Sequence, residues 1–150
     1  MRALRIADHR FPILDGTGAK LAGGRWNSPG SPVIYAAETF AGAMLEILVR
    51  ANLNRLPRTY VYVELSIDET GSCERLAEFG LPGWDSDGEL VSRSFGDQWL
   101  TKARSAVLIV PSKVTGGVET NLLINPLHPD FDKIRAGEPK TVLWDSRFFQ

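Results

Sequence analysis

The sequence has few of the residue types that disulfides and metal sites require. Its 150 residues contain one cysteine, Cys73, so no internal disulfide can form, as is typical of proteins in a reducing compartment. Its two histidines, His9 and His128, are too few and too far apart in the chain for a convincing metal site. We therefore expect a cytoplasmic protein with no bound metal.

Long apolar runs and the familiar nucleotide-binding and hydrolase motifs are also missing. The longest apolar run covers residues 106–111, whereas a membrane helix needs about 20 apolar residues. The first residues carry interspersed charges, so we expect no signal peptide and no membrane association. There is no Gly-x-x-x-x-Gly-Lys-Ser/Thr loop, no Gly-x-Gly-x-x-Gly after a strand and no Gly-x-Ser-x-Gly elbow. The sequence thus disfavours a P-loop enzyme and a triad hydrolase.

Charge is nearly balanced over the whole chain but not along it. The formal net charge of −1 argues against direct binding of nucleic acid, and the lack of a His or Lys cluster argues against an RNase. Residues 68–89, the acidic segment, contain seven acidic residues and one arginine, a net −6 that leaves +5 for the rest of the chain. This segment is either a solvated loop or a surface for a partner or lid.

Hydrophobic periodicity and chain breakers predict one α+β domain over residues 1–150. Glycine and proline in residues 15–32 predict a loop, and the acidic segment is expected to be mostly irregular. We expect strands at 33–37, 60–67, 106–110, 121–124 and 141–144, and helices at 40–51, with Thr39 as N-cap, and at 90–102, interrupted near Gly96. Because strands outnumber helices and do not alternate with them, we expect a curved, largely antiparallel sheet.

Glu46 is the candidate carboxylate of the helix predicted at 40–51. The apolar face of this helix consists of residues at helical spacing, namely Phe40, Met44, Ile47, Leu48 and Ala51. At 100° per residue, Glu46 lies about 120° from the centre of this face, neither in the core nor fully outward. An i,i+4 ion pair with Arg50 is the structural alternative to a catalytic role.

Other polar and aromatic candidates lie beside glycine-rich backbone or at strand ends. Arg25 lies in a Gly-Gly-Arg-Trp-Asn sequence, where the backbone can approach a ligand closely and a guanidinium can grip phosphate through two hydrogen bonds. Trp26 is a core or rim anchor or a stacking platform, and Tyr35 ends an apolar strand. Ser112 and Asn121 also have ordinary interpretations as turn and strand-end residues. Taken singly, none of these signals is specific.

In their order along the chain, five short segments together resemble the RES domain. They are Arg-Ile-Ala-Asp at 5–8, Gly-Arg-Trp-Asn at 24–27, Val-Ile-Tyr-Ala at 33–36, Leu-Glu at 45–46 and Val-Pro-Ser at 110–112. The resemblance runs from about residue 4 to the C-terminus. That family is named for its Arg, Glu and Ser, and it supplies the toxin of RES–Xre toxin–antitoxin systems.

The resemblance implies a fold similar to ADP-ribosyltransferases, with a split antiparallel sheet around an NAD cleft. Family members deplete NAD by hydrolysis or phosphorolysis, and some transfer ADP-ribose to a protein. By resemblance, the family's Arg, Tyr, Glu and Ser correspond to Arg25, Tyr35, Glu46 and Ser112. The expected function is therefore that of a type II toxin that cleaves the nicotinamide–ribose bond of NAD and arrests growth.

These residue types suit the chemistry that the resemblance implies. Cleavage passes through an oxocarbenium-like ribose, whose growing positive charge a carboxylate such as Glu46 stabilises. Arg25 would hold the dinucleotide phosphate or orient the ribose, with Trp26 beside it, and Tyr35 would pack on the nicotinamide side. Ser112 would bind substrate or position Glu46, and Asn121 is a further substrate-binding candidate. NAD is then the substrate, and no separate cofactor is needed.

Two other functions stay open from the sequence. ADP-ribosyl transfer to a host protein uses the same site, because the acceptor can be water, inorganic phosphate or a side chain. A non-catalytic binding module would need Arg25 and Glu46 only as surface ion pairs. The expected protein partner is an Xre-type antitoxin, through which alone the chain would contact DNA.

Overall fold

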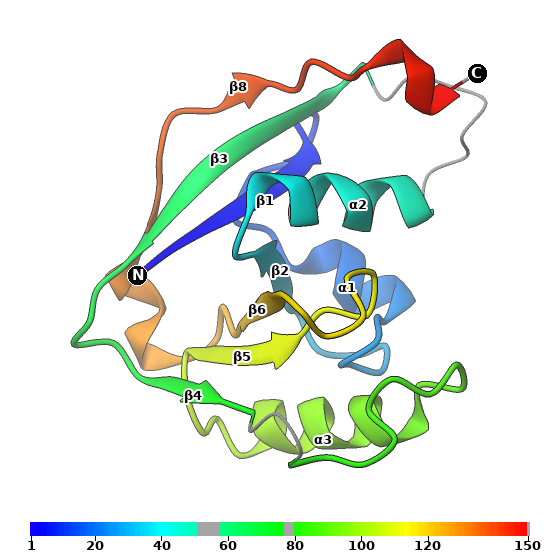
Figure 1. The fold of residues 1–150 in the computed structure, drawn as a ribbon. Coiled ribbons are helices and arrows are strands. Elements are labelled where there is room, and N and C mark those ends of the chain that lie inside the picture. The colour runs from blue at the N-terminus through cyan, green and yellow to red at the C-terminus, as the bar shows by residue number, and fades with distance from the viewer. Residues whose placement is uncertain (51–57, 77–79, 150) are drawn as a thin grey trace.

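The structure of this chain is a computed structural model, and it describes residues 1–50, 58–76 and 80–149. Figure 1 shows the strands of a curled sheet with a small number of helices beside them. The elements in chain order are β1 Arg2–Asp8, α1 Thr17–Ala22, β2 Ile34–Ala37, α2 Phe40–Arg50, β3 Tyr60–Ile67, β4 Cys73–Arg75, α3 Leu90–Thr101, β5 Val107–Pro111, β6 Thr120–Ile124, η1 Pro129–Lys133, β7 Ile134–Ala136, β8 Lys140–Thr141 and η2 Ser146–Phe149, where η marks a 3-10 helix. No helix in the described ranges is both long enough and apolar enough to span a bilayer.

The eight strands found in the described residues belong to one mixed sheet, in the order β4-β5-β6-β2-β1-β3-β7, with β8 also paired to β3. Only β4 and β5 pair in parallel, and every other described pair is antiparallel. The predicted α+β class, with a curved and largely antiparallel sheet and few helices, is confirmed.

The inner core lies inside the curl of the sheet. Val107 and Ile109 of β5 belong to the same buried cluster as Val63 and Leu65 of β3, although three strands separate β5 from β3 in the sheet order. Strands so far apart in the order can share one core only if the sheet curls into a half-barrel. The twist between neighbouring strands, accumulated across the sheet, produces this curl.

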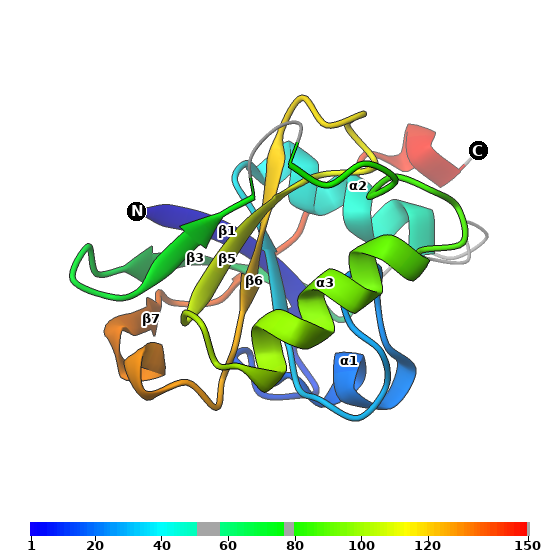
Figure 2. The same ribbon diagram turned by 90° about the horizontal axis from the view of Figure 1, so that it is seen from below.

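The opposite face of β5 and β6 is covered by α3. Leu108, Val110 and Leu123 pack with Trp99 of α3, which is fully buried. Figure 2 shows α3 lying beside β5 and β6. Because β5 is buried on both faces, its sequence is a continuous apolar run rather than an alternation of apolar and polar residues.

Helix α2 packs on β1 and β2 through one apolar stripe. Ala43 is buried in a cluster with Ile6 and Ala37, and the partly buried side chains of the stripe pack against it. The Thr39 hydroxyl accepts a 2.9 Å hydrogen bond from the Gly42 amide, so the predicted N-cap is confirmed. The apolar residue predicted at the end of the helix, Ala51, lies outside the described residues.

The loop predicted over residues 15–32 contains a short helix, α1, so that prediction was wrong in part. An Asp15 oxygen accepts hydrogen bonds from the Thr17 amide at 3.0 Å and from the Thr17 hydroxyl at 2.6 Å, which starts the helical turn. The helix ends at Gly23, whose φ of +74° suits glycine. Six residues between breakers are enough for this helix, and periodicity cannot detect so short an element.

The interruption predicted near Gly96 is also wrong, because α3 is continuous through that residue. Gly96 instead permits close packing, since a Cβ on it would lie 1.7 Å from the carbonyl oxygen of Trp26. The last predicted strand, 141–144, is reduced to β8 at Lys140–Thr141. Among its described residues, the acidic segment is irregular apart from β4, as predicted, and residues 77–79 lie outside the described residues.

Candidate active site

A cavity of about 890 Å³ lies against the sheet between β1, β2, α1 and α2. Five of the six site residues predicted from the sequence line it, namely Arg25, Trp26, Tyr35, Glu46 and Asn121. Its wall also carries the cations Arg5, Arg50, Arg93 and Lys113 and the acids Asp8, Asp15 and Glu89. A volume of this size lies within the range of small-molecule sites, and the walls can hold an anionic ligand.

Three predicted site residues from distant parts of the chain meet at the Glu46 carboxylate. Asn121 of β6 donates a 2.8 Å hydrogen bond from Nδ2 to Glu46 Oε1. The Ser112 hydroxyl, buried directly after β5, lies 3.5 Å from the same oxygen. The other oxygen, Oε2, lies 4.0 Å from the Arg50 guanidinium. The side chain of Glu46 is 24% exposed, so this carboxylate is fixed at one oxygen and remains open to the cavity.

Asn121 also has an unsatisfied acceptor. Its Oδ1 is buried and has no hydrogen-bond partner among the described residues. Buried polar atoms of this kind are rare in native proteins and call for an explanation. Asn121 lines the cavity, but Oδ1 itself is shielded from solvent, so the side chain is held in place by its hydrogen bond to Glu46.

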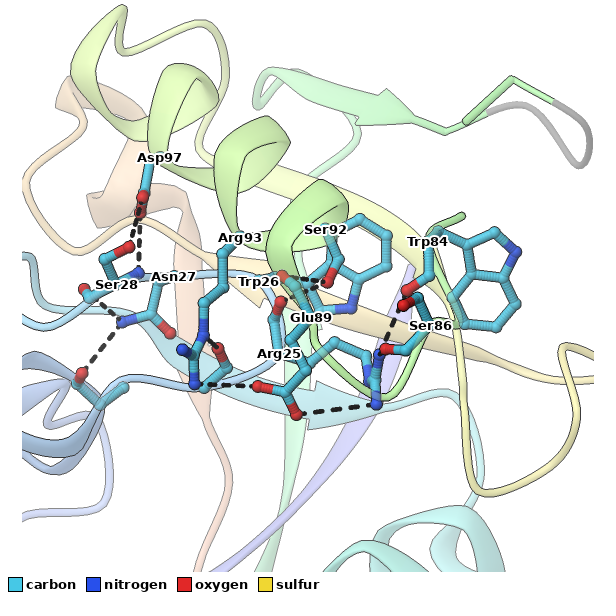
Figure 3. A network of polar contacts seen from close by, with 12 residues as sticks. Arg25, Trp26, Asn27, Ser28, Trp84, Ser86, Glu89, Ser92, Arg93 and Asp97 are labelled. Carbon is cyan, nitrogen blue, oxygen red and sulfur yellow. Dashed lines mark hydrogen bonds and ion pairs between the residues drawn. The ribbon is translucent and has the colours of Figure 1, made fainter. Parts of the chain in front are cut away.

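Arg25 connects the glycine-rich loop, residues 23–30, to the acidic segment, as Figure 3 shows. Its Nη1 donates to the carbonyl oxygens of Trp84 at 3.2 Å and Ser86 at 3.0 Å, and its Nη2 lies 3.6 Å from Glu89 Oε1. The Ser92 hydroxyl donates to the Arg25 carbonyl at 2.6 Å. The end of the acidic segment thus packs directly on the predicted phosphate-binding residue.

Tyr35 holds the glycine-rich loop through two hydrogen bonds of its hydroxyl group. Its hydroxyl donates a 2.6 Å hydrogen bond to Asn27 Oδ1 and accepts one from the Trp26 amide at 3.3 Å. Gly24 allows this contact, because a Cβ there would lie 2.7 Å from the Tyr35 hydroxyl. Burial raises the pKa of Tyr35, so its hydroxyl stays protonated and acts as a hydrogen-bond donor. The Arg50 guanidinium lies over the ring, 5.7 Å from its centre.

Trp26 is 2% exposed and belongs to the core cluster under α3. Its indole stacks on Trp84 with ring centres 6.3 Å apart and meets Phe95 edge-on at 6.4 Å. Of the two interpretations of Trp26, this placement fits the anchor. A stacking platform for a ligand would need an open ring face.

Sequence reasoning did not select Arg5, Asn27, Glu89 or Arg93 as site residues. Arg5 donates to the carbonyl oxygens of Ile13 at 2.7 Å and of Tyr35 at 2.8 Å, and burial lowers its pKa to about 10. Arg5 and Asn27 fall inside the segments that carry the RES resemblance, which was a usable signal. Nothing in the sequence pattern singled out Glu89 and Arg93. Among the described residues, no group of three or more His, Cys, Asp or Glu is placed to hold a metal ion.

The fold is shared with a bacterial toxin of known structure. The crystal structure of the M. tuberculosis MbcT-MbcA toxin-antitoxin complex matches with a TM-score of 0.72, covering 94% of this chain and 83% of that chain at 16% identity. This chain and that structure therefore share one fold, a curled mixed sheet with few helices.

Sequence relatives narrow this class to one family. The Prs ADP-ribosylating toxin of Sphingobium sp. (strain YBL2) is 44% identical, over 91% of this chain and 87% of its own length. Toxin Res of Pseudomonas putida is 35% identical, over 93% of this chain and 94% of its own. The family model of the RES domain matches residues 2–145. The chain belongs to the RES domain family, as the five segments predicted.

Proposed function

We propose that this chain is a toxin enzyme that breaks the nicotinamide–ribose bond of NAD. The observation that carries the proposal is the Glu46 carboxylate, which Asn121 fixes at 2.8 Å on the wall of a cavity of about 890 Å³. Cations, including Arg25 and Arg93, line the same cavity. The cavity therefore offers a carboxylate for a developing cation and guanidinium groups for a diphosphate.

The carboxylate acts on the ribose. As nicotinamide leaves, positive charge grows on the ribose, and Glu46 stabilises that charge more in the transition state than in the ground state. Hydrogen bonds from Asn121 and Ser112 to one oxygen fix the carboxylate before the substrate arrives, so little reorganisation is needed during the reaction.

Arg25 and Tyr35 serve binding in this proposal. Arg25 grips the diphosphate with the guanidinium face that its contacts to the acidic segment leave accessible, its side chain being 17% exposed. Tyr35 packs near the nicotinamide end and keeps the glycine-rich loop in place through Asn27. NAD is the substrate, so the proposal requires neither a metal nor a separate cofactor.

Transfer of ADP-ribose to a protein is the second candidate function. It is favoured by the relative that is 44% identical and is named for ADP-ribosylating Prs. Both functions begin with the same bond cleavage and differ in the acceptor, which is water or phosphate in one case and a protein side chain in the other. The name supports a protein acceptor, whereas the cavity geometry supports the cleavage itself.

One set of assays separates these functions. Purified chain is incubated with NAD, with or without inorganic phosphate and with or without Prs, and free nicotinamide and the mass of Prs are measured. Nicotinamide release without a change in the mass of Prs indicates hydrolysis, or phosphorolysis where phosphate accelerates it. A mass increase of one ADP-ribose on Prs indicates transfer. No nicotinamide release under any condition would leave a non-catalytic binding module and reject the proposal.

The proposal includes neutralisation by an Xre-type antitoxin in the cytoplasm. It is supported by the MbcT neighbour, which was crystallised in a toxin-antitoxin complex, and by the relatives named Toxin Res. Expression of the chain should stop bacterial growth, and co-expression of the antitoxin should restore it. Growth that continues although the chain is made and folded would contradict the toxin function.

A further inference from the structure

Glu89 bridges two arginines on the wall of the cavity. Its Oε2 lies 2.9 Å from Arg93 Nη2, while its Oε1 lies 3.6 Å from Arg25 Nη2, so each carboxylate oxygen faces a different guanidinium (Figure 3). All three residues line the cavity. The single negative charge of Glu89 is shared between two positive charges, and the group as a whole remains cationic.

The backbone at Glu89 is unfavourable for a residue with a side chain. Glu89 immediately precedes α3 with a φ of +60°, and its side chain makes no capping hydrogen bond to the helix. A carboxylate at this place would ordinarily stabilise the first turn of a helix by bonding to its free amides. In this chain it turns toward the two arginines instead, at a cost in local stability.

Both arginines stay anchored independently of Glu89. Arg25 donates to the carbonyl oxygens of Trp84 and Ser86, and Arg93 Nε donates to the Gly24 carbonyl at 2.9 Å. If Glu89 turned away, these contacts would still hold the two guanidinium groups beside each other. A pair of cations that is oriented before the ligand arrives binds an anion with little loss of entropy.

We infer that Arg25 and Arg93 form a diphosphate-binding subsite, and that Glu89 is an internal counter-ion which the diphosphate displaces. Guanidinium groups bind phosphate oxygens through paired, charge-assisted hydrogen bonds, and two linked phosphates can engage two guanidinium groups at once. A diphosphate carries more charge than the carboxylate that it replaces. Glu89 thus determines specificity, because it admits diphosphate-bridged ligands and opposes weaker anions.

The inference rests on the proposed function in one respect, namely that NAD supplies the diphosphate. The subsite itself can be tested without NAD, by calorimetric titration of inorganic pyrophosphate into the purified chain at fixed ionic strength. Glu89→Gln keeps the shape of the side chain and removes its charge. Because the like-charge repulsion with the ligand is lost, we expect pyrophosphate to bind about tenfold more tightly. Arg93→Gln should weaken binding by about tenfold, since one of the two guanidinium groups is lost.

Glu69→Gln is the matched control for charge. It removes the same charge from the same segment, but Glu69 is exposed and does not line the cavity, whereas Asp87 pairs with the cavity residue Lys113 at 3.6 Å. Pyrophosphate affinity should stay within about twofold in this variant, because an exposed charge is screened by salt. Melting temperatures show whether each variant is folded. If Glu89→Gln does not fold, Glu89→Asp replaces it, because the shorter side chain cannot reach both arginines and should give intermediate affinity.

Two results would overturn the inference. The first is a Glu89→Gln affinity for pyrophosphate equal to or weaker than that of the unmodified chain. The second is an equal gain in Glu69→Gln, which would trace the effect to net charge. NAD cleavage is assayed separately on the same preparations. The expected pyrophosphate pattern without nicotinamide release keeps the subsite and rejects the proposed function, whereas cleavage with no effect of Glu89→Gln keeps the function and rejects the subsite.

Discussion

Asn121 Nδ2 lies 2.8 Å from Glu46 Oε1 and connects β6 to α2 across 75 residues of sequence. The hydrogen bond fixes one carboxylate oxygen, while Oε2 has Arg50 at 4.0 Å, beyond hydrogen-bond distance. The two oxygens of Glu46 are therefore not equivalent. Oε1 belongs to the protein scaffold, and Oε2 is the oxygen that can face a substrate.

Glu46→Gln should lower NAD turnover by about 100- to 1000-fold, as the loss of one transition-state electrostatic group does. Folding should persist, because the side chain lies beside the apolar stripe of α2 and not in it. Turnover is measured as nicotinamide release, and folding as the melting temperature. Glu38→Gln is the control, since Glu38 is exposed and accepts a hydrogen bond from the Thr120 amide outside the cavity. Near-normal turnover in Glu46→Gln would remove Glu46 from the mechanism.

Asn121→Ala should reduce kcat by about 10- to 100-fold with a small change in KM, because a hydrogen bond to a charged group is lost. Ser112→Ala should reduce kcat less, since its 3.5 Å contact with Glu46 lies at the limit of hydrogen bonding. The separation of kcat from KM is the readout for a positioning role. A rise in KM alone, with kcat unchanged, would assign Asn121 to substrate binding instead.

Local patterns predicted the parts of this site that depend on one segment. Helical spacing placed Glu46 at the edge of the apolar face of α2, and it is half-buried there. Thr39 was recognisable as an N-cap because capping needs only neighbouring residues. The resemblance to the RES domain supplied Ser112, which by itself follows a strand like many turn residues.

Long-range contacts could not be predicted in the same way. The contact of Arg25 with Trp84 and Ser86 spans about 60 residues, and no periodicity carries information over such a separation. Gly96 looked like a helix breaker, and only the tertiary structure shows that the Trp26 carbonyl occupies the space of its missing side chain. For the acidic segment the sequence favoured a solvated loop and kept a partner or lid surface as the alternative, because charge alone does not say what the segment packs against.

Arg25→Lys should be almost as damaging as Arg25→Ala. The guanidinium contacts three groups in different directions, the carbonyl oxygens of Trp84 and Ser86 and the carboxylate of Glu89, and one ammonium cannot reproduce this geometry. We expect weaker NAD binding and faster amide hydrogen exchange at residues 84–89. Arg2→Lys is the control, because Arg2 is an exposed residue paired with Glu64. Unchanged NAD binding in Arg25→Lys would show that any positive charge suffices.

Gly96→Ala should destabilise the fold by about 2–3 kcal/mol, in the upper part of the range for overpacked cores. The added Cβ would lie 1.7 Å from the Trp26 carbonyl oxygen, so α3 or the loop that carries Trp26 must move. Denaturant unfolding measures the change. Gly18→Ala is the control, because its Cβ would meet nothing within 4 Å and alanine favours a helix by up to about 1 kcal/mol. Equal stability of the two variants would contradict the close packing of α3.

The exposed part of the acidic segment should steer the antitoxin. Asp85 and Asp87 are exposed, whereas Glu89 is turned toward Arg25 and Arg93, so the first two are available to a basic face of a partner. Asp85→Asn with Asp87→Asn should slow association with an Xre-type antitoxin and weaken its dependence on salt, because steering acts through long-range charge. NAD cleavage should not change.

The control is Asp68→Asn with Glu69→Gln, which alters the other end of the segment by the same charge. Association is followed by stopped-flow mixing at several salt concentrations. Equal slowing in both double variants would indicate net charge rather than a local docking surface. Whether the bound antitoxin also covers the cavity is decided separately, by whether the complex still binds pyrophosphate.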